Sequence, residues 1–142
     1  MFIKQLTVFM ENVSGRIQEI TEVLGANNIN IVTLSIADTH EFGIARFIVS
    51  DPDKGRQLLK EAGFTAKLSN VYAFAIDNKP GMLTNTLKCI KESGSGIEYL
   101  YVLSTSGSSS FIIKLDNDEK ILQYVEKGDI ILLDEETVYN MN

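Results

Sequence analysis

The first half of the chain alternates apolar and polar residues with two different periods, one typical of strands and one typical of helices. Residues 5–10 place Leu6, Val8 and Met10 on one side, as expected of a strand with one buried face. By this criterion the first half contains four strands, over residues 5–10, 29–37, 43–49 and 64–68. A turn over residues 38–42 joins the second and third strands into a predicted hairpin.

Two stretches of the first half show the helical period. Between residues 15 and 26 the apolar residues recur every three to four positions, until Asn27 and Asn28 stop the helix. A second helix is expected after Asp51, because its carboxylate can cap free amides and Pro52 is tolerated at the first helical position. The order strand, helix, strand, strand, helix, strand predicts a ferredoxin-like α+β unit, an antiparallel sheet with both helices on one face.

The second half of the chain repeats the first at a constant interval of 66 residues. Identical residues occupy both positions of the pairs Asn12 and Asn78, Gly15 and Gly81, Ile31 and Ile97, and Leu34 and Leu100. The second copy therefore predicts strands over residues 71–77, 97–104, 110–115 and part of 130–139, and helices over residues 81–93 and 118–127. Asn117 is expected to cap the last helix, and residues 134–136 to form a solvated bend. The chain thus predicts two βαββαβ units, residues 1–70 and 71–142, related by a pseudo-twofold axis.

The predicted strand over residues 97–104 is apolar on both faces. One face carries Ile97, Tyr99, Tyr101 and Leu103, and the other face carries Leu100 and Val102. Burying one large apolar side chain is worth about 1.5–3 kcal/mol, so exposing such a stripe would be costly. We therefore expect the other copy or a second chain to cover it, which favours a homodimer.

Charge and composition argue against several classes of partner. The chain has 19 acidic and 13 basic residues and a net charge of −6, whereas binding a nucleic acid backbone requires a basic surface. No apolar run approaches the roughly 20 residues of a membrane span, and the N-terminal residues do not have the pattern of a signal peptide. The single cysteine, Cys89, cannot form an intrachain disulfide. We expect a cytoplasmic protein that binds neither nucleic acid nor membrane.

The loop between the first strand and the first helix of each copy is the best candidate for a binding site. These loops span residues 11–17 and 77–83. A helix N-terminus presents unpaired amides and a partial positive charge that suit a carboxylate, and Gly15 and Gly81 let a ligand approach the backbone closely. The alternative is that asparagine and glycine serve here only to cap the helix and turn the chain.

The second of these loops carries a family resemblance. The residues Asp77-Asn78-Lys79-Pro80-Gly81-Met82-Leu83 follow an apolar strand and precede a helix, and Gly-Ile-Glu-Tyr-Leu-Tyr follows at residues 96–101. This arrangement resembles an ACT domain, and the first copy resembles a second, more degenerate one. The resemblance implies a regulatory module that binds amino acids where two domains meet, with the strand-to-helix loop and the second strand of a neighbouring domain lining the site.

Carried over by position, the resemblance nominates residues of both loops and of the opposing strands. They are Asn12, Val13, Gly15, Arg16 and Ile17; Asn78, Pro80, Gly81, Met82 and Leu83; and Ile31, Val32, Ile97, Glu98 and Tyr99. The first copy has Val13-Ser14 in place of Lys79-Pro80, which leaves open whether both clefts are used. Arg16 adds a cation that a ligand carboxylate could bind, whereas Met82 can only pack. Glu98 is either the partner of an ammonium group or a solvated strand carboxylate.

No group of residues suggests catalysis, a metal site or a cofactor. Cys89 corresponds to Val23 of the first copy, which indicates a packing position. His40 is the only histidine and falls in the predicted hairpin turn, where it is expected to be exposed. The serine-rich run over residues 104–110 connects two strands, so it predicts a hairpin and not a phosphate-binding loop.

The sequence therefore predicts a non-catalytic sensor that holds a free amino acid between paired ACT-like units. It is expected to form a homodimer and to regulate a partner enzyme in trans. The alternative is an oligomerisation or interaction module whose ligand clefts are vestigial.

Overall fold

The computed structural model describes residues 2–11, 13–38, 41–106 and 109–141, and these divide into two compact units. Residues 4–70 and 136–141 make up the N-terminal unit, and residues 71–135 and 2–3 make up the C-terminal unit. The boundary between the two units falls after Asn70. Residues 2–3 at the start of the chain nevertheless belong to the C-terminal unit, and residues 136–141 at its end belong to the N-terminal unit.

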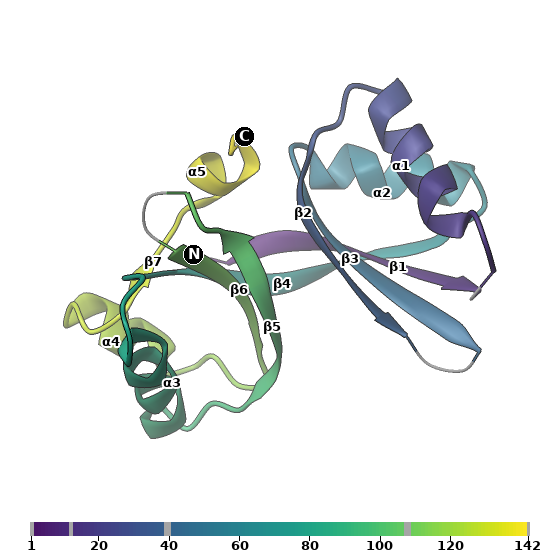
Figure 1. The fold of residues 1–142 in the computed structure, drawn as a ribbon. Helices are drawn as coiled ribbons and strands as arrows, with labels where there is room; N and C mark the ends of the chain where they lie inside the picture. Colours follow the sequence, from purple (N-terminus) through teal and green to yellow (C-terminus); the bar gives the residue numbers. More distant parts are fainter. Residues whose placement is uncertain (1, 12, 39–40, 107–108, 142) are drawn as a thin grey trace. The chain divides into compact units, whose positions relative to one another are not determined.

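The N-terminal unit has the predicted βαββαβ order (Figure 1). Its elements are β1 (Ile3–Glu11), α1 (Arg16–Ala26), β2 (Ile31–Asp38), β3 (Phe42–Val49), α2 (Pro52–Glu61) and the first half of β4 (Thr65–Ile76). The strands lie in the order β2-β3-β1-β4, and both helices lie on the same side of the sheet. Leu6 and Val8 of β1 are fully buried beneath Ile20 and Leu24 of α1, which confirms the predicted core face.

The C-terminal unit repeats this arrangement. It contains the second half of β4, then α3 (Met82–Glu92), β5 (Ile97–Ser104), β6 (Ser109–Leu115), α4 (Ile121–Glu126) and β7 (Ile131–Leu132). The strand order is β7-β4-β6-β5, and all of these pairings are antiparallel. Its core groups Phe74, Ile90 and Ile113 with neighbouring apolar residues. Tyr72 is buried beside them and donates a short hydrogen bond to Asp118, and burial together with this carboxylate raises the pKa of Tyr72 far above its usual value.

Two predicted strands, over residues 64–68 and 71–77, are in fact one. β4 runs without a break through Ser69 and Asn70, which the sequence pattern places between two strands. Neither residue is glycine or proline, so the backbone can stay extended. Ser69 Oγ lies 3.0 Å from Thr7 Oγ1, which gives its hydroxyl group a partner next to β1.

The elements near the C-terminus also differ from the prediction. α4 begins at Ile121 and not at residue 118, because Asn117 Oδ1 accepts a hydrogen bond from the backbone of Glu119 and forms a turn ahead of the helix. The terminal strand is reduced to the two residues of β7. Residues 135–139, predicted in part as a bend and in part as a strand, form the short helix α5 (Glu135–Tyr139).

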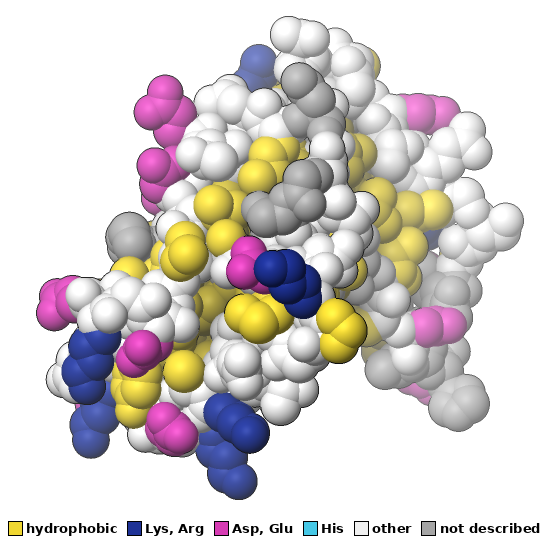
Figure 2. Space-filling view, turned by 60° about the vertical axis from the view of Figure 1, so that its left-hand side comes forward, with side chains coloured by type: hydrophobic (Ala, Val, Ile, Leu, Met, Phe, Trp, Pro, Cys, Tyr) yellow, Lys and Arg dark blue, Asp and Glu magenta, His cyan; other side chains and the backbone are white. Residues whose placement is uncertain are grey.

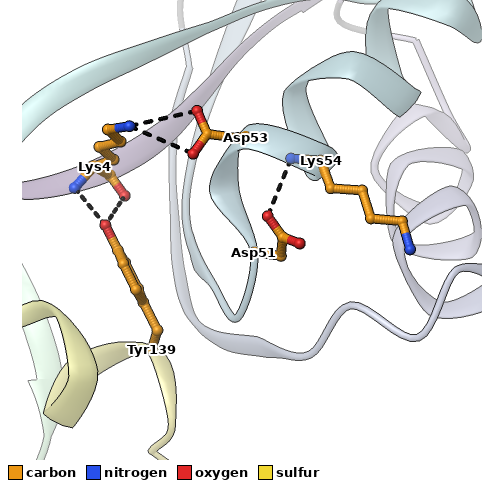
Figure 3. A network of polar contacts seen from close by, with 5 residues as sticks. All are labelled: Lys4, Asp51, Asp53, Lys54 and Tyr139. Carbon is orange, nitrogen blue, oxygen red and sulfur yellow. Dashed lines mark hydrogen bonds and ion pairs between the residues drawn. The ribbon is translucent and has the colours of Figure 1, made fainter.

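α5 is held by packing and by one polar contact. Val138 is fully buried, and the Tyr139 hydroxyl accepts a 2.8 Å hydrogen bond from the backbone N–H of Lys4 (Figure 3). Lys4 Nζ lies 3.4 Å from the carboxylate of Asp53 in the first turn of α2. Sequence periodicity could not predict this helix, because five residues are too few to show a helical period and its stability comes from tertiary contacts.

The predicted cap of α2 is confirmed. Asp51 Oδ1 accepts a 3.2 Å hydrogen bond from the backbone N–H of Lys54, and Pro52 occupies the first helical position (Figure 3). This contact satisfies one of the amides that a helix leaves unpaired at its N-terminus, and so fixes where α2 begins.

Each unit has an edge strand with exposed apolar residues, β2 in one and β5 in the other. On β5, Leu100 is 38% exposed and Val102 is 46% exposed. The register pairs them with Ile113 and Phe111 of β6, so they lie on the face that carries the helices. Their counterparts Leu34 and Ile36 on β2 are exposed in the same way, and further apolar side chains reach the surface in the view of Figure 2.

The other face of β5 carries tyrosines. Tyr99 and Tyr101 point away from the helices, and their rings stack with centroids 6.4 Å apart. Both are half-buried, whereas Leu103 on the same face is buried. β5 therefore carries apolar side chains on both faces, as predicted. Its side chains are more exposed on the face of Leu100 than on the face of Tyr99.

Candidate functional site

The two strand-to-helix junctions have nearly the same backbone. Gly15 has φ 88° and ψ −6°, and Gly81 has φ 85° and ψ −11°. This left-handed conformation favours glycine, which explains why the residue recurs at the same place in both copies. In each junction an amide donates to the carbonyl two residues earlier, from Val13 N to Glu11 O at 2.8 Å and from Lys79 N to Asp77 O at 2.9 Å.

The first turns of α1 and α3 also match. The amides of Glu19 and Asn85 each donate over 3.1 Å to the carbonyl of the glycine four residues earlier. Among the described residues, no side chain caps either helix. The backbone amides of residues 17 and 18, and of residues 83 and 84, lie in the first turn of their helices. Amides in a first turn have no acceptor within the helix. Both junctions therefore have amides oriented to receive an acceptor atom.

A pocket of about 260 Å³ lies at the N-terminal junction, and we call it the loop pocket. Four of the nominated residues line it, and they are Val13, Gly15, Arg16 and Ile17. Asn12, the fifth nominated residue of this loop, lies outside the described residues. The rest of the lining comes from Met10, Glu11, Ser14, Ile36, Asp38 and Gly43.

Ile31 and Val32, nominated as the opposing wall, do not line the loop pocket. They stand at the start of β2, where Ile31 pairs with Val49, while the junction follows Glu11 at the other end of the sheet. The wall inside the unit is made by the opposite end of β2, at Ile36 and Asp38.

Sequence reasoning missed Asp38 and Gly43, although the ladder explains their place. Asp38 pairs with Gly43 of β3, and Gly43 pairs with Met10 of β1, so the three residues lie side by side next to the loop. β1 and β2 are parallel neighbours on either side of β3, which puts both of their C-terminal ends at the same edge. The signal was therefore available from the predicted strand order, but only once the exact register was known.

The loop pocket contains charges of both signs. Arg16 Nη1 lies 3.0 Å from Glu19 Oε2 one turn along α1, and both side chains are partly exposed. Asp38 and Glu11 supply carboxylates to the same pocket. A cation next to helix amides suits a carboxylate, and a nearby acid suits an ammonium group, so the pocket can match both ends of a zwitterion.

The C-terminal junction lacks a counterpart of Arg16, because Met82 occupies the equivalent position. Asn78, Pro80 and Gly81 are exposed, whereas Met82 and Leu83 are half-buried against the core of their unit. The remaining nominated residues of this unit are Ile97, Glu98 and Tyr99.

These three residues stand at the start of β5. Ile97 pairs with Leu115, whereas the end of β4 next to the junction pairs with Ser109. Within this unit they therefore lie at the opposite end of the sheet from residues 77–83. Glu98 is exposed and Tyr99 is half-buried.

The residues that could suggest other chemistry are Cys89, His40 and the serine-rich run over residues 104–110. Cys89 is half-buried against the C-terminal core, as expected of a packing position, and burial followed by the charges of Asp129 and Glu92 raises the pKa of its thiol. His40 lies outside the described residues, as does part of the serine-rich run. Within the described ranges there is no group of three His, Cys, Asp or Glu side chains that could hold a metal ion.

The described part of the chain also contains no helix that is both long and apolar enough to cross a membrane.

Comparison with solved structures supports a shared fold. A protein from Bacteroides thetaiotaomicron, BT0572, is 37% identical, with a TM-score of 0.93 over 99% of this chain and 98% of that chain. The regulatory subunit of aspartate kinase from Thermus thermophilus, in its ligand-free form, has a TM-score of 0.65 at 14% identity over 87% of this chain and 91% of that chain. The corresponding subunit from Thermus flavus has a TM-score of 0.62 at 15% identity over 87% of this chain and 90% of that chain. No curated protein matches the sequence.

The family comparison covers the whole chain. The model of the ACT domain pair matches residues 1–142, in agreement with the two βαββαβ units and with their repeated glycine turn. The protein therefore belongs to the family of ACT domain pairs.

Proposed function

We propose that this protein is a non-catalytic regulatory protein that binds a free amino acid in the loop pocket of its N-terminal unit. The observation that carries the proposal is the meeting of Arg16, Asp38 and the α1 amides around one pocket of about 260 Å³. The α-carboxylate would accept hydrogen bonds from the amides and from Arg16, and the ammonium group would donate to Asp38. Val13, Ile17 and Ile36 would contact the side chain.

The C-terminal junction is proposed as a weaker site. Its backbone offers the same amides, but Met82 stands where Arg16 stands in the other unit and supplies no charge. A ligand carboxylate there would be bound by backbone groups alone. Ile31, Val32, Ile97, Glu98 and Tyr99 would contribute only from a neighbouring domain, because within one unit they lie at the other end of the sheet.

A homodimer is part of the proposal. The exposed pairs Leu34 with Ile36 and Leu100 with Val102 lie on the edge strands of the two units. A second copy that adds its own edge strand would cover both. The regulated enzyme would be a separate protein in the same cytoplasm. The similar chains from the two Thermus species are regulatory subunits of aspartate kinase, which supports a regulatory role.

Thermal unfolding against a panel of the 20 common amino acids tests the proposal. A ligand present at 100 times its dissociation constant stabilises the folded state by about 2.7 kcal/mol, which is an easily measured shift. Arg16→Met should reduce the shift, and Arg56→Met, an exposed arginine on α2 outside the loop pocket, should not. A panel without any shift, or equal shifts in both variants, would contradict the proposed site.

The second candidate is an interaction module with vestigial clefts. The exposed apolar residues of β2 and β5 favour it, since they explain association without any ligand. Sedimentation of Ile36→Glu and Val102→Glu tests the dimer that both functions predict, and the response of the unaltered chain to amino acids separates the two functions. An unliganded dimer that these variants dissociate, together with no response to any amino acid, would favour the interaction module.

A further inference from the structure

We infer that the N-terminal unit has a second small-molecule site, which takes an organic ammonium ion with an aromatic or aliphatic group. The site is a pocket of about 340 Å³ where β1 ends, and we call it the phenylalanine pocket. Its lining includes Phe9, Glu11, Phe42 and Phe64. The phenylalanine pocket shares Met10, Glu11 and Arg16 with the loop pocket, whereas Phe9, Phe42 and Phe64 line the phenylalanine pocket alone.

The strand register brings the acid and two of the rings to one face of the sheet. Glu11 of β1 pairs directly with Phe42 of β3, and Phe9 precedes Glu11 by two residues. Residues that pair across a ladder and residues two apart on one strand share a face. Glu11 therefore shares one face of the sheet with Phe9 and Phe42, and all three line the phenylalanine pocket.

The rings remain open to solvent. Phe9 is 36% exposed and Phe42 is 55% exposed, while Phe64 is half-buried against the core. A monomeric domain rarely leaves large aromatic side chains exposed next to a hollow, and such groupings mark binding sites. An apolar group of a ligand that covers Phe42 would remove this surface from water.

The charges of the phenylalanine pocket favour a cation. Glu19 and Arg16, which also line it, form an ion pair with each other. Glu11 takes part in no ion pair among the described residues, so its charge is the one left for a ligand. Aromatic faces also attract ammonium groups, and the chain itself gives an example, since Lys67 Nζ lies 5.5 Å from the centre of the Phe9 ring.

The volume of the phenylalanine pocket limits the size of the ligand. Ala62 and Gly63 follow the end of α2, and the added β-carbon of any other residue at Gly63 would meet nothing within 4 Å. The backbone there is open, which leaves room for a ring or a short alkyl chain. A volume of about 340 Å³ is at the small end of ligand pockets and fits a ligand of the size of an aromatic amine.

Two probes with the same ring and opposite charge test the inference. Phenethylamine is a cation at neutral pH, and 3-phenylpropionate is an anion of similar size. Titration of the full chain, followed by calorimetry and by NMR of the backbone amides, should give saturable binding of the amine. Shifts should centre on residues 9–11, 42 and 62–65. The anion should bind at least tenfold more weakly.

Matched variants complete the experiment. Phe42→Ala and Glu11→Gln should each raise the dissociation constant of phenethylamine at least fivefold. Phe2→Ala, an exposed phenylalanine of the C-terminal unit, and Glu22→Gln, an acid of α1 outside the pocket, should leave it unchanged. Equal binding of the two probes, no saturation, or unchanged affinity in Phe42→Ala would overturn the inference. Because Glu11 lines both pockets and Phe42 lines only the phenylalanine pocket, Phe42→Ala is the variant that distinguishes a failure here from a failure of the amino-acid panel.

Discussion

The two strand-to-helix junctions have the same backbone but different side-chain chemistry. The corresponding φ angles of Gly15 and Gly81 differ by a few degrees, and the corresponding backbone hydrogen bonds agree closely in length. One turn into the helix, Arg16 forms an ion pair with Glu19, whereas Met82 contacts Asn85 through an amide-to-sulfur contact of 4.0 Å. The turn geometry is what both copies need to begin their first helix, and the side chains around it are free to diverge.

We expect this divergence to give the two units different affinities for a ligand. A positive charge at position 16 adds a strong, charge-assisted partner for a carboxylate, but the neighbouring Glu19 competes for it. In the C-terminal junction the position equivalent to Arg16 is Met82, which supplies no charge. We therefore expect binding to be dominated by the N-terminal unit, and the predictions below compare equivalent positions of the two units.

The largest effect is expected from the cores. Leu24 and Ile90 are equivalent positions on α1 and α3, and both are fully buried. Replacing either by alanine should lower the free energy of unfolding by about 2–5 kcal/mol, through lost apolar burial and the cavity that remains. Urea unfolding with circular dichroism measures the loss. If one of the two substitutions is tolerated without cost, the packing of that unit is not as described.

The next largest effect is expected on ligand affinity. Arg16→Met makes the N-terminal junction resemble the C-terminal one, and it should weaken amino-acid binding by about 1.5–3 kcal/mol, the usual value of a hydrogen bond to a charged group. This corresponds to a roughly 10- to 100-fold increase in the dissociation constant measured by calorimetry.

The reciprocal variant, Met82→Arg, is the matched test. It should strengthen binding at the C-terminal junction, seen as a second calorimetric site. An unchanged affinity in Arg16→Met would show that the backbone amides alone determine binding.

A smaller and equal effect is expected from the two glycines. Gly15→Ala and Gly81→Ala force a residue with a β-carbon into the left-handed region, although nothing stands within 4 Å of the added atom in either case. The cost should therefore come from the backbone alone, about 1–2 kcal/mol in each variant. Unequal shifts in the urea midpoints would mean that the two turns are less alike than their angles indicate.

The smallest effect is expected from the ion pair itself. Glu19→Gln removes an exposed partner of Arg16 and should lower the free energy of unfolding by less than about 1 kcal/mol, since solvent screens such pairs. The same change should tighten amino-acid binding, because Arg16 no longer has a competing carboxylate. Glu22→Gln, which removes an acid that accepts a hydrogen bond from Gln18, is the control and should not change the affinity. Weaker binding in Glu19→Gln would indicate that Glu19 contacts the ligand.

Much of the fold could be predicted from the sequence because its signals are local. Apolar periodicity located β1 and α1, the Asp51-Pro52 pair located the start of α2, and the repeat extended these assignments to the second half. The continuity of β4 and the helix α5 could not be predicted in this way. Both depend on partners far along the chain, namely Thr7 beside Ser69 and Lys4 beside Tyr139.

The candidate site was predictable to a similar degree. The loop residues Val13, Gly15, Arg16 and Ile17 follow from the repeated glycine turn and the family resemblance. Asp38 did not, since its place next to the loop depends on the exact register of β2 against β3 and β1. The ion pair between Arg16 and Glu19 was likewise not predicted from the sequence, although a spacing of three residues on a helix permits it.

The exchange of chain ends has a consequence for how this protein can be divided. A fragment stopping at Asn70 would contain most of the N-terminal unit but would lack Val138, which is fully buried, and Tyr139, which bonds to Lys4. A fragment starting at Val71 would lack Ile3, a buried residue of the C-terminal unit. The ancestral duplication thus no longer leaves two separable halves, and a gene encoding only one of them would yield a protein with part of its interior missing.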